Sequence, residues 1–191
     1  MPKRRGEGRL TVAIVVAFAV TACSSTSSTL RSTTSGSTIP SAVVPTSSPL
    51  ASAVAVPGGC GQTQVYRGGI PVWLRDGIQG LTGMENAPYA LAGPTPAAGF
   101  LLAYPLKAGT HAPAKILWVM STPRNGDPLQ IRVNPSGAAE PVVTASRPAD
   151  SGPGEIYPDG VSVPSSGCWH FKLQWATGNA ELDLSYSADG P

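Results

Sequence analysis

The C-terminal segment of the chain alternates apolar and polar residues, which strongly restricts the structures it can form. Between Cys168 and Trp175 every second residue is apolar, and the alternation resumes after residues 176–179 and continues to Tyr186. A period of two residues puts one set of side chains on one face of a β-strand. The pattern therefore predicts an antiparallel hairpin with one apolar face. On its polar face, we expect Lys172 to lie near Glu181 or Asp183.

Shorter strand-like segments precede this hairpin at the spacing of an antiparallel sandwich. They are Gly99–Leu106, Lys115–Met120, Leu129–Val133, Pro141–Ser146, Gly154–Pro158 and Val161–Val163. Residues Asn125-Gly126-Asp127 tolerate positive φ and predict a hairpin turn between the second and third segments. Twenty prolines and twenty-two glycines fit many turns and oppose long helices, and one helical turn is expected within Trp73–Leu81.

The N-terminus is typical of a secretory signal. A basic patch (Lys3, Arg4, Arg5 and Arg9) precedes an apolar run of about thirteen residues that ends at Ala22, too short to cross roughly 30 Å of hydrocarbon. The run ends in Val20-Thr21-Ala22-Cys23, which resembles the lipobox of bacterial lipoproteins. This resemblance implies cleavage after residue 22 and lipidation of Cys23. An ordinary signal peptide, with Cys23 as a plain thiol, is the alternative.

Removal of residues 1–22 changes the charge balance of the protein. The full chain has thirteen basic and eleven acidic residues. The signal segment accounts for four basic residues and one acidic residue, so about nine and ten remain. Since the mature chain is then nearly neutral, nucleic-acid binding is not expected.

Composition divides the remaining chain into a tether and one domain. Residues 23–57 are rich in Ser, Thr and Pro, contain no aromatic residue and predict a flexible tether, either unmodified or O-glycosylated. Residues 58–191, roughly 134 residues, are enough for a single β-sandwich domain. Outside the cytoplasmic membrane, the two cysteines of this domain, Cys60 and Cys168, are expected to form a disulfide.

The segment Pro148–Trp175, together with Lys115–Met120, resembles a family of uncharacterised secreted or lipid-anchored actinobacterial envelope proteins. Related Gly-Cys-Trp strand motifs, here Gly167-Cys168-Trp169, end small immunoglobulin-like domains in other envelope proteins. The resemblance implies an immunoglobulin-like antiparallel β-sandwich and an envelope location. It brings no activity and no catalytic residues.

The sequence predicts no catalytic site and no metal or cofactor site. It has no G-x-S-x-G elbow, and both histidines, His111 and His170, are interpreted as surface residues. Zinc motifs such as H-E-x-x-H are absent. Asp150, Glu155 and Asp159 are close in sequence and could bind calcium, but their spacing matches no calcium loop.

Five residues are the candidate ligand contacts: Trp73, Tyr89, Glu155, Tyr157 and Asp159. They come from the segment with the weakest strand pattern, residues 67–96, and from the loop before the last strands. The other tryptophans, Trp118, Trp169 and Trp175, are expected in the core. We therefore expect a lipid-anchored, non-enzymatic binding or interaction module on the extracytoplasmic side of the cell membrane, whose partner is an envelope ligand or protein. The alternatives are a glycan-directed hydrolase that uses Glu155 with Asp150 or Asp159, and a structural spacer.

Overall fold

The computed structural model describes residues 52–109, 114–150 and 154–188. The predicted signal peptide, Cys23 and His111 lie outside these ranges, as does most of the predicted tether. Ten strands, one short helix and one 3₁₀ turn are present in the described part: β1 Val54–Val56, β2 Val65–Arg67, α1 Val72–Gly77, η1 Met84–Asn86, β3 Tyr89–Pro94, β4 Ala97–Leu101, β5 Ala114–Met120, β6 Leu129–Pro135, β7 Val143–Arg147, β8 Ile156–Val161, β9 Gly167–Trp175 and β10 Gly178–Tyr186.

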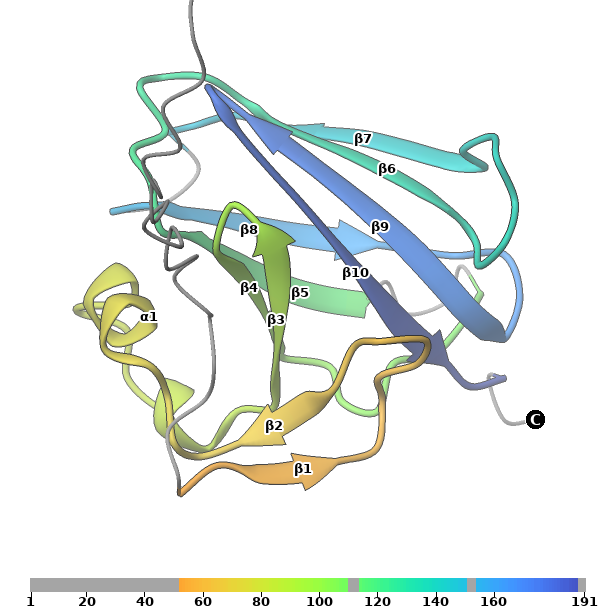
Figure 1. The fold of residues 1–191 in the computed structure, drawn as a ribbon, viewed down its shortest axis with the longest axis horizontal. Helices are drawn as coiled ribbons and strands as arrows, with labels where there is room; N and C mark the ends of the chain where they lie inside the picture. Colours follow the sequence, from red (N-terminus) through yellow and green to blue (C-terminus); the bar gives the residue numbers. More distant parts are fainter. Residues whose placement is uncertain (1–51, 110–113, 151–153, 189–191) are drawn as a thin grey trace, which may run out of the picture. The chain divides into compact units, whose positions relative to one another are not determined.

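The strands are all antiparallel and form two sheets that meet at β3 (Figure 1). Sheet I has the order β7-β6-β9-β10, and sheet II has the order β3-β4-β5-β8 with β2 and β1 beyond β3. Residues Gly93 and Pro94 of β3 pair with β10, whereas the rest of β3 pairs with β4 and β2. The all-β class is confirmed, and the immunoglobulin-like topology stays a prediction.

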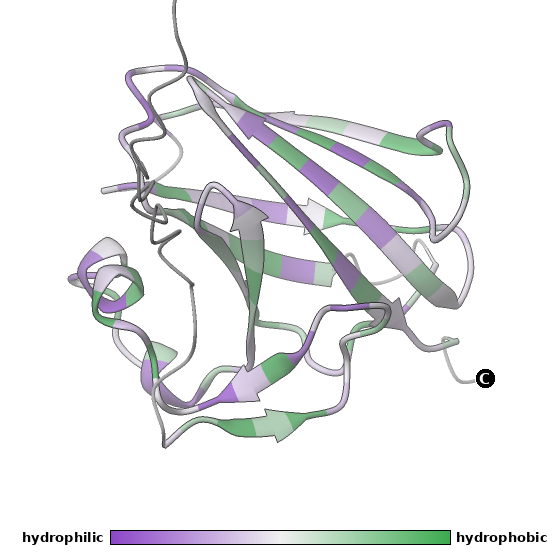
Figure 2. Cartoon of the chain, in the orientation of Figure 1, coloured by the Kyte–Doolittle hydropathy of each residue, from purple (hydrophilic) through white to green (hydrophobic). Residues whose placement is uncertain are grey.

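The main core lies between the two sheets. Sheet I contributes one face of β6, β9 and β10, including Trp169, Phe171 and Trp175, and sheet II contributes Trp118 and Tyr157. The tryptophans predicted for the core, at positions 118, 169 and 175, are at most 2 % exposed. The opposite face of sheet I is polar, which explains the alternating pattern along β6 and β9 that Figure 2 shows.

The central strands of sheet II, β3, β4 and β5, are largely buried on both faces, because α1 and the segments beside it cover the side away from sheet I. Leu74 and Ile78 of this region pack with Tyr89, Phe100 and Val119 in a second apolar cluster. A strand that is buried on both faces has no reason to alternate. This is why β4 and β5 have nearly continuous apolar sequences, and why the pattern in residues 67–96 did not identify β3.

The predicted C-terminal hairpin is confirmed. Strands β9 and β10 pair along their full length, with Lys172 opposite Glu181 and their charged atoms 3.9 Å apart. The hairpin predicted at Asn125-Gly126-Asp127 is wrong. A turn is present there, with φ of 53° at Asn125 and 83° at Gly126, but β5 and β6 belong to different sheets and do not pair with each other. Turn residues determine the local dihedral angles. Which strands then pair depends on which of their faces become buried.

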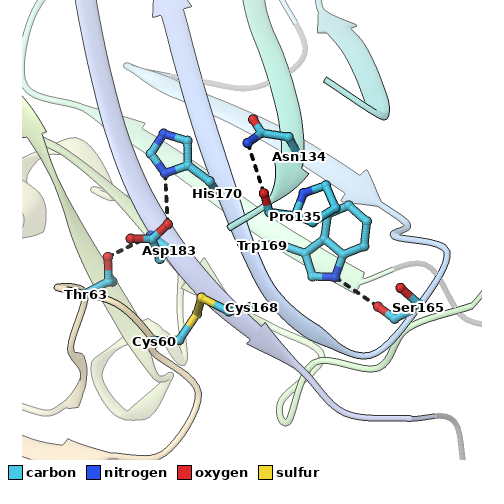
Figure 3. The surroundings of a disulfide bond; sticks show 9 residues. All are labelled: Cys60, Thr63, Asn134, Pro135, Ser165, Cys168, Trp169, His170 and Asp183. Carbon is cyan, nitrogen blue, oxygen red and sulfur yellow. Dashed lines mark hydrogen bonds and ion pairs between the residues drawn. A yellow bond between two sulfur atoms is a disulfide. The ribbon is translucent and has the colours of Figure 1, made fainter. Parts of the chain in front are cut away.

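The disulfide predicted between Cys60 and Cys168 is present, with Cα atoms 5.9 Å apart (Figure 3). It joins the β1–β2 connection to the start of β9 across a sequence separation of 108 residues. Strand β1 lies inside the range predicted as tether, so strand pairing begins at Val54, before the predicted domain boundary. Within the described residues no helix is long and apolar enough to span a bilayer.

Candidate functional site

The β5–β6 connection crosses from sheet II to sheet I, and core side chains hold it at two points. Trp175 of β9 donates its indole N–H to Thr122 Oγ1 at 3.0 Å. Tyr157 of β8 donates its hydroxyl to the Asp127 carbonyl oxygen at 2.8 Å. Because both donors extend from the packed core, the loop between these points has a defined position next to the end of β8.

A groove of about 700 Å³ lies between this connection and the one from β7 to β8. We call it the loop groove, and its lining residues are Arg124, Asn125, Gly126, Pro128, Pro148, Ala149, Asp150 and Glu155. Its volume is within the range of about 300–1,000 Å³ typical of small-ligand sites. The prolines restrict the backbone on both sides, because each one fixes its own φ.

An arginine–glutamate pair forms the polar centre of the loop groove. The backbone N–H of Arg124 donates to Glu155 Oε2 at 2.7 Å, and its Nε lies 3.6 Å from the same oxygen. Arg124 Nη1 also donates to the Ile156 carbonyl oxygen at 2.6 Å. The guanidinium lies 5.3 Å from the centre of the Tyr157 ring, within the range of a cation–π contact. Four interactions thus fix Arg124, whose side chain is 14 % exposed, while that of Glu155 is 39 % exposed.

Among the five predicted ligand contacts, Glu155 is the one that lines this groove. Tyr157 is fully buried beneath it, and burial raises the pKa of its hydroxyl above the ordinary value of 10.0. Tyr157 therefore contacts Arg124 and Asp127 from the core side of the groove. It was predicted as a surface ligand contact, but it is a core residue.

Asp159 is also buried, in a second ion pair on the same strand. Its side chain has no exposed area and bonds to the guanidinium of Arg147 on β7, whose side chain is 30 % exposed. The indole N–H of Trp118 donates to the other carboxylate oxygen at 3.4 Å. Asp159 therefore joins the edge strands β7 and β8 and is not available as a surface ligand contact.

The predicted catalytic pairing of Glu155 with Asp159 does not fit this geometry. The side chain of Asp159 has no exposed area, so a substrate in the loop groove cannot reach its carboxylate. Each of the two carboxylates instead faces its own arginine, Glu155 facing Arg124 and Asp159 facing Arg147. Asp150, the other predicted partner, does line the loop groove together with Glu155.

Trp73 and Tyr89 belong to the α1 side of sheet II. Tyr89 is fully buried between Tyr66 and Phe100, and its hydroxyl donates to the Gly69 carbonyl oxygen at 3.0 Å. Burial raises the pKa of Tyr89 to about 12. Trp73 is half-buried and packs against the same apolar cluster. Neither residue lines the loop groove, so the five candidates do not form one site.

His170, which the sequence suggested was a plain surface residue, lies between two carboxylates. Its Nδ1 is 2.8 Å from Asp183 Oδ1, and its Nε2 is 3.3 Å from Glu181 Oε2. Thr63 Oγ1 accepts the backbone N–H of Asp183 at 2.7 Å, next to the disulfide (Figure 3). Cross-strand register brings these residues together, since His170 lies opposite Asp183. In the described ranges, no group of three or more His, Cys, Asp or Glu side chains is arranged to hold a metal ion.

Sequence reasoning missed Arg124, the most strongly held polar residue of the loop groove. The one signal in the sequence was its position directly before the Asn125-Gly126 turn, which places its side chain at the base of a tight loop. Comparisons with protein-family models, with curated proteins and with solved structures found no match to this chain.

Proposed function

We propose that this protein is a lipid-anchored, non-enzymatic binding module of the cell envelope and that the loop groove is its binding site. The anchor is supported by the basic and apolar N-terminus that ends at Cys23. A disulfide between Cys60 and Cys168 is consistent with an oxidising compartment outside the cytoplasm.

The Arg124–Glu155 pair is the main structural support for a binding function. Ligand sites are concave and contain a few polar groups whose positions are set before the ligand arrives. Hydrogen bonds and the Tyr157 ring hold Arg124, and Arg124 in turn holds one carboxylate oxygen of Glu155. Little conformational entropy is then lost when a ligand contacts the exposed part of this carboxylate.

The charges of the groove indicate the chemistry of its ligand. Arg124 is already paired with Glu155, so the free acceptors of the groove are the remaining carboxylate capacity of Glu155 and the exposed Asp150. Carboxylates accept hydrogen bonds and attract cations. The groove therefore favours a polar ligand that carries amino or hydroxyl groups, such as an amino-sugar oligosaccharide.

Binding of two matched oligosaccharides tests this proposal. An amino-sugar oligomer and its N-acetylated form differ in positive charge, and we expect the full-length protein in detergent to bind the amino form more tightly in calorimetric titrations. Glu155→Gln should weaken that binding about tenfold, equivalent to about 1.4 kcal/mol. The matched control is Glu140→Gln, at an exposed position outside the groove. Equal affinity of both variants, or binding of neither sugar, contradicts the proposal, and the second result favours a spacer.

The lipid anchor has its own test. Cys23→Ser removes the thiol that would carry the lipid, so we expect the variant to be released from membranes or to remain unprocessed. Phase partitioning in detergent and intact-protein mass measure both outcomes. An unchanged partition into the detergent phase would show that Cys23 is not the anchor.

Hydrolysis of a glycan is a second candidate, because Asp150 and Glu155 line the same groove. In this case Glu155→Gln would abolish product formation without a change in the melting temperature. Release of reducing ends from glycan by the unmodified protein, in the absence of any other enzyme, is the result that would favour hydrolysis over binding.

A further inference from the structure

The outer face of sheet I carries a regular array of polar side chains in cross-strand rows. In one row, Gln130, Gln174 and Asn179 lie side by side on β6, β9 and β10, and in the next row the neighbours are Arg132, Lys172 and Glu181. All six side chains belong to exposed residues. Together with Leu173 and Ala180 they line a depression of about 300 Å³. We call these six residues the sheet I patch.

At the centre of the patch, two positive charges lie directly opposite each other. Arg132 and Lys172 are register partners on neighbouring strands. Lys172 lies 3.9 Å from Glu181, but among the described residues no carboxylate forms an ion pair with Arg132. Like charges at directly opposite positions destabilise a sheet. An anion between the two side chains would remove this repulsion.

The neighbouring groups define where such an anion binds and what surrounds it. Glu181 and the Asp183–His170 pair make the β10 side of the patch acidic, so the anion is expected on the β6 side, next to Arg132. There the amide of Gln130 donates to Ser146 Oγ at 2.9 Å, and Gln174 lies opposite on β9. Amide side chains both donate and accept hydrogen bonds, which suits hydroxyl groups.

We propose that the sheet I patch binds a carboxylate or phosphate group carried by a hydroxylated chain, with Arg132 as its main contact and Lys172 as the second. The guanidinium suits this role because it matches both kinds of oxyanion with two parallel hydrogen bonds. The chemistry is that of an acidic polysaccharide or of a polyol phosphate polymer. The patch is distinct from the loop groove, so this proposal is independent of the function proposed above.

Three soluble oligomers serve as probes for the full-length protein: a uronic-acid oligosaccharide, a glycerol phosphate oligomer and a neutral glucan of similar length. We expect one or both anionic oligomers to bind in titration calorimetry and the neutral glucan not to bind. Their relative affinities distinguish carboxylate from phosphate as the natural group. Binding should weaken when the ionic strength rises from 0.01 to 0.15 M, because the Debye length falls from about 30 Å to about 8 Å.

Arg132→Gln should weaken binding of the anionic oligomer about tenfold. Arg132→Lys keeps the charge but loses the two parallel N–H donors of the guanidinium, so it should weaken binding less. The matched control is Lys115→Gln, the same loss of charge at an exposed position on sheet II.

The melting temperature of Arg132→Gln should stay the same or rise, since the substitution removes a like-charge pair. If Arg132 had only a structural role, its replacement would lower the melting temperature. Glu155→Gln should leave this binding unchanged, which separates it from the loop groove. Equal binding by Arg132→Gln and the unmodified protein, or equal binding of the neutral glucan, would overturn the proposal.

Discussion

Strand β8 and the residue directly before it form the same pairing, a carboxylate with an arginine, in two different environments. Glu155, directly before the strand, lies in the loop groove with a side chain that is 39 % exposed. Asp159, within the strand, has no exposed side-chain area and pairs with Arg147 across the gap between β7 and β8. In each pair the cation comes from a different connection or strand, so tertiary structure and not local sequence creates both.

The two pairs differ in exposure to solvent, and this exposure decides the role of each ion pair. Water screens the Glu155 pair, which therefore contributes little to stability but leaves carboxylate surface for a ligand. Asp159 has lost its hydration, and its arginine is the group that compensates. We infer that the Asp159 pair stabilises the fold and that the Glu155 pair is available for binding.

Replacement of Arg147 by methionine should have the largest effect on stability. It leaves the fully buried carboxylate of Asp159 without its cation, and removal of one partner from a buried pair costs about 3–5 kcal/mol in the free energy of unfolding. Chemical denaturation measures this loss. Arg132→Met, at an exposed position without an ion pair, is the control and should change stability by at most about 0.5 kcal/mol. A loss below about 1 kcal/mol for Arg147→Met would show that water reaches Asp159.

Replacement of Asp159, the acidic member of this pair, should lower the free energy of unfolding by less. Asp159→Asn removes the charge but keeps a group that can accept the Trp118 N–H, and Arg147, with 30 % of its side chain exposed, can remain hydrated. We expect a loss of about 1–3 kcal/mol in the same denaturation experiment. Glu155→Gln makes the equivalent change directly before β8 and should cost at most about 1 kcal/mol. Equal losses at the two positions would remove the distinction between the pairs.

Tyr157 of β8, which lies between Glu155 and Asp159 in the sequence, provides a test in alkaline solution. Tyr157→Phe loses the hydrogen bond to the Asp127 carbonyl and should cost about 1 kcal/mol at neutral pH. Because burial raises its pKa in the folded state, the unfolded chain releases this proton first, near pH 10.0. Stability from this group is therefore complete below pH 10 and falls as the pH rises further.

Unfolding followed as a function of pH should thus show a shallower alkaline decline in Tyr157→Phe than in the unmodified protein. Part of the decline will remain, because the pKa of Tyr89 is raised to about 12 and its contribution is lost between pH 10 and 12. The control for the loss of one tyrosine-to-carbonyl hydrogen bond is Tyr104→Phe, whose hydroxyl donates to the Pro57 oxygen at 2.8 Å. Identical alkaline curves for Tyr157→Phe and the unmodified protein would contradict the burial argument.

The smallest effect is expected at Tyr186, and it has the opposite sign. Its hydroxyl is buried and has no hydrogen-bond partner within the described part of the chain, and burial together with the nearby Asp159 carboxylate raises its pKa. Tyr186→Phe removes a buried polar group that gains nothing from folding, so we expect unchanged stability or a gain of up to about 1 kcal/mol. Thermal unfolding measures this change. A clear loss of stability would mean that the hydroxyl has a partner.

The parts of the fold that the sequence predicted well are those with one face in water. Strands β6, β9 and β10 alternate because sheet I separates the core from solvent, and this made the hairpin, the Lys172–Glu181 contact and the burial of Trp169 and Trp175 predictable. Strand β3 has solvent on neither side for most of its length, so its sequence has no period that identifies it. The Asn125-Gly126 turn suggested a hairpin because local turn chemistry carries no information about the sheet to which each neighbouring strand belongs.

The candidate site was predictable only in part for the same reason. Glu155 was identified as an acid in a loop rich in proline and glycine. Its partner Arg124 is 31 positions away in sequence, and only the crossing of β5 into β6 between the sheets brings the two together. Tyr89 and Tyr157 were selected as aromatic residues in or near segments with a weak strand pattern. Both are buried instead, because a large aromatic side chain removes much apolar area from water when it packs in the core. Burial on both faces of the sheet thus concealed strand β3 and the roles of both tyrosines, although part of β8 was predicted as the segment Gly154–Pro158.

The Cys60–Cys168 disulfide also determines how the domain bears mechanical force. When the chain is pulled from its N-terminal side, tension reaches Cys60 and passes through a covalent bond directly into β9. Strand β1 precedes Cys60, so the tension meets its pairing with β2 before it reaches the disulfide. From β9, the load passes in shear to its neighbour β6, which begins directly after the loop that lines the groove. A ligand held in that groove would therefore be connected to the N-terminal side of the chain through one covalent cross-link and one pair of hydrogen-bonded strands.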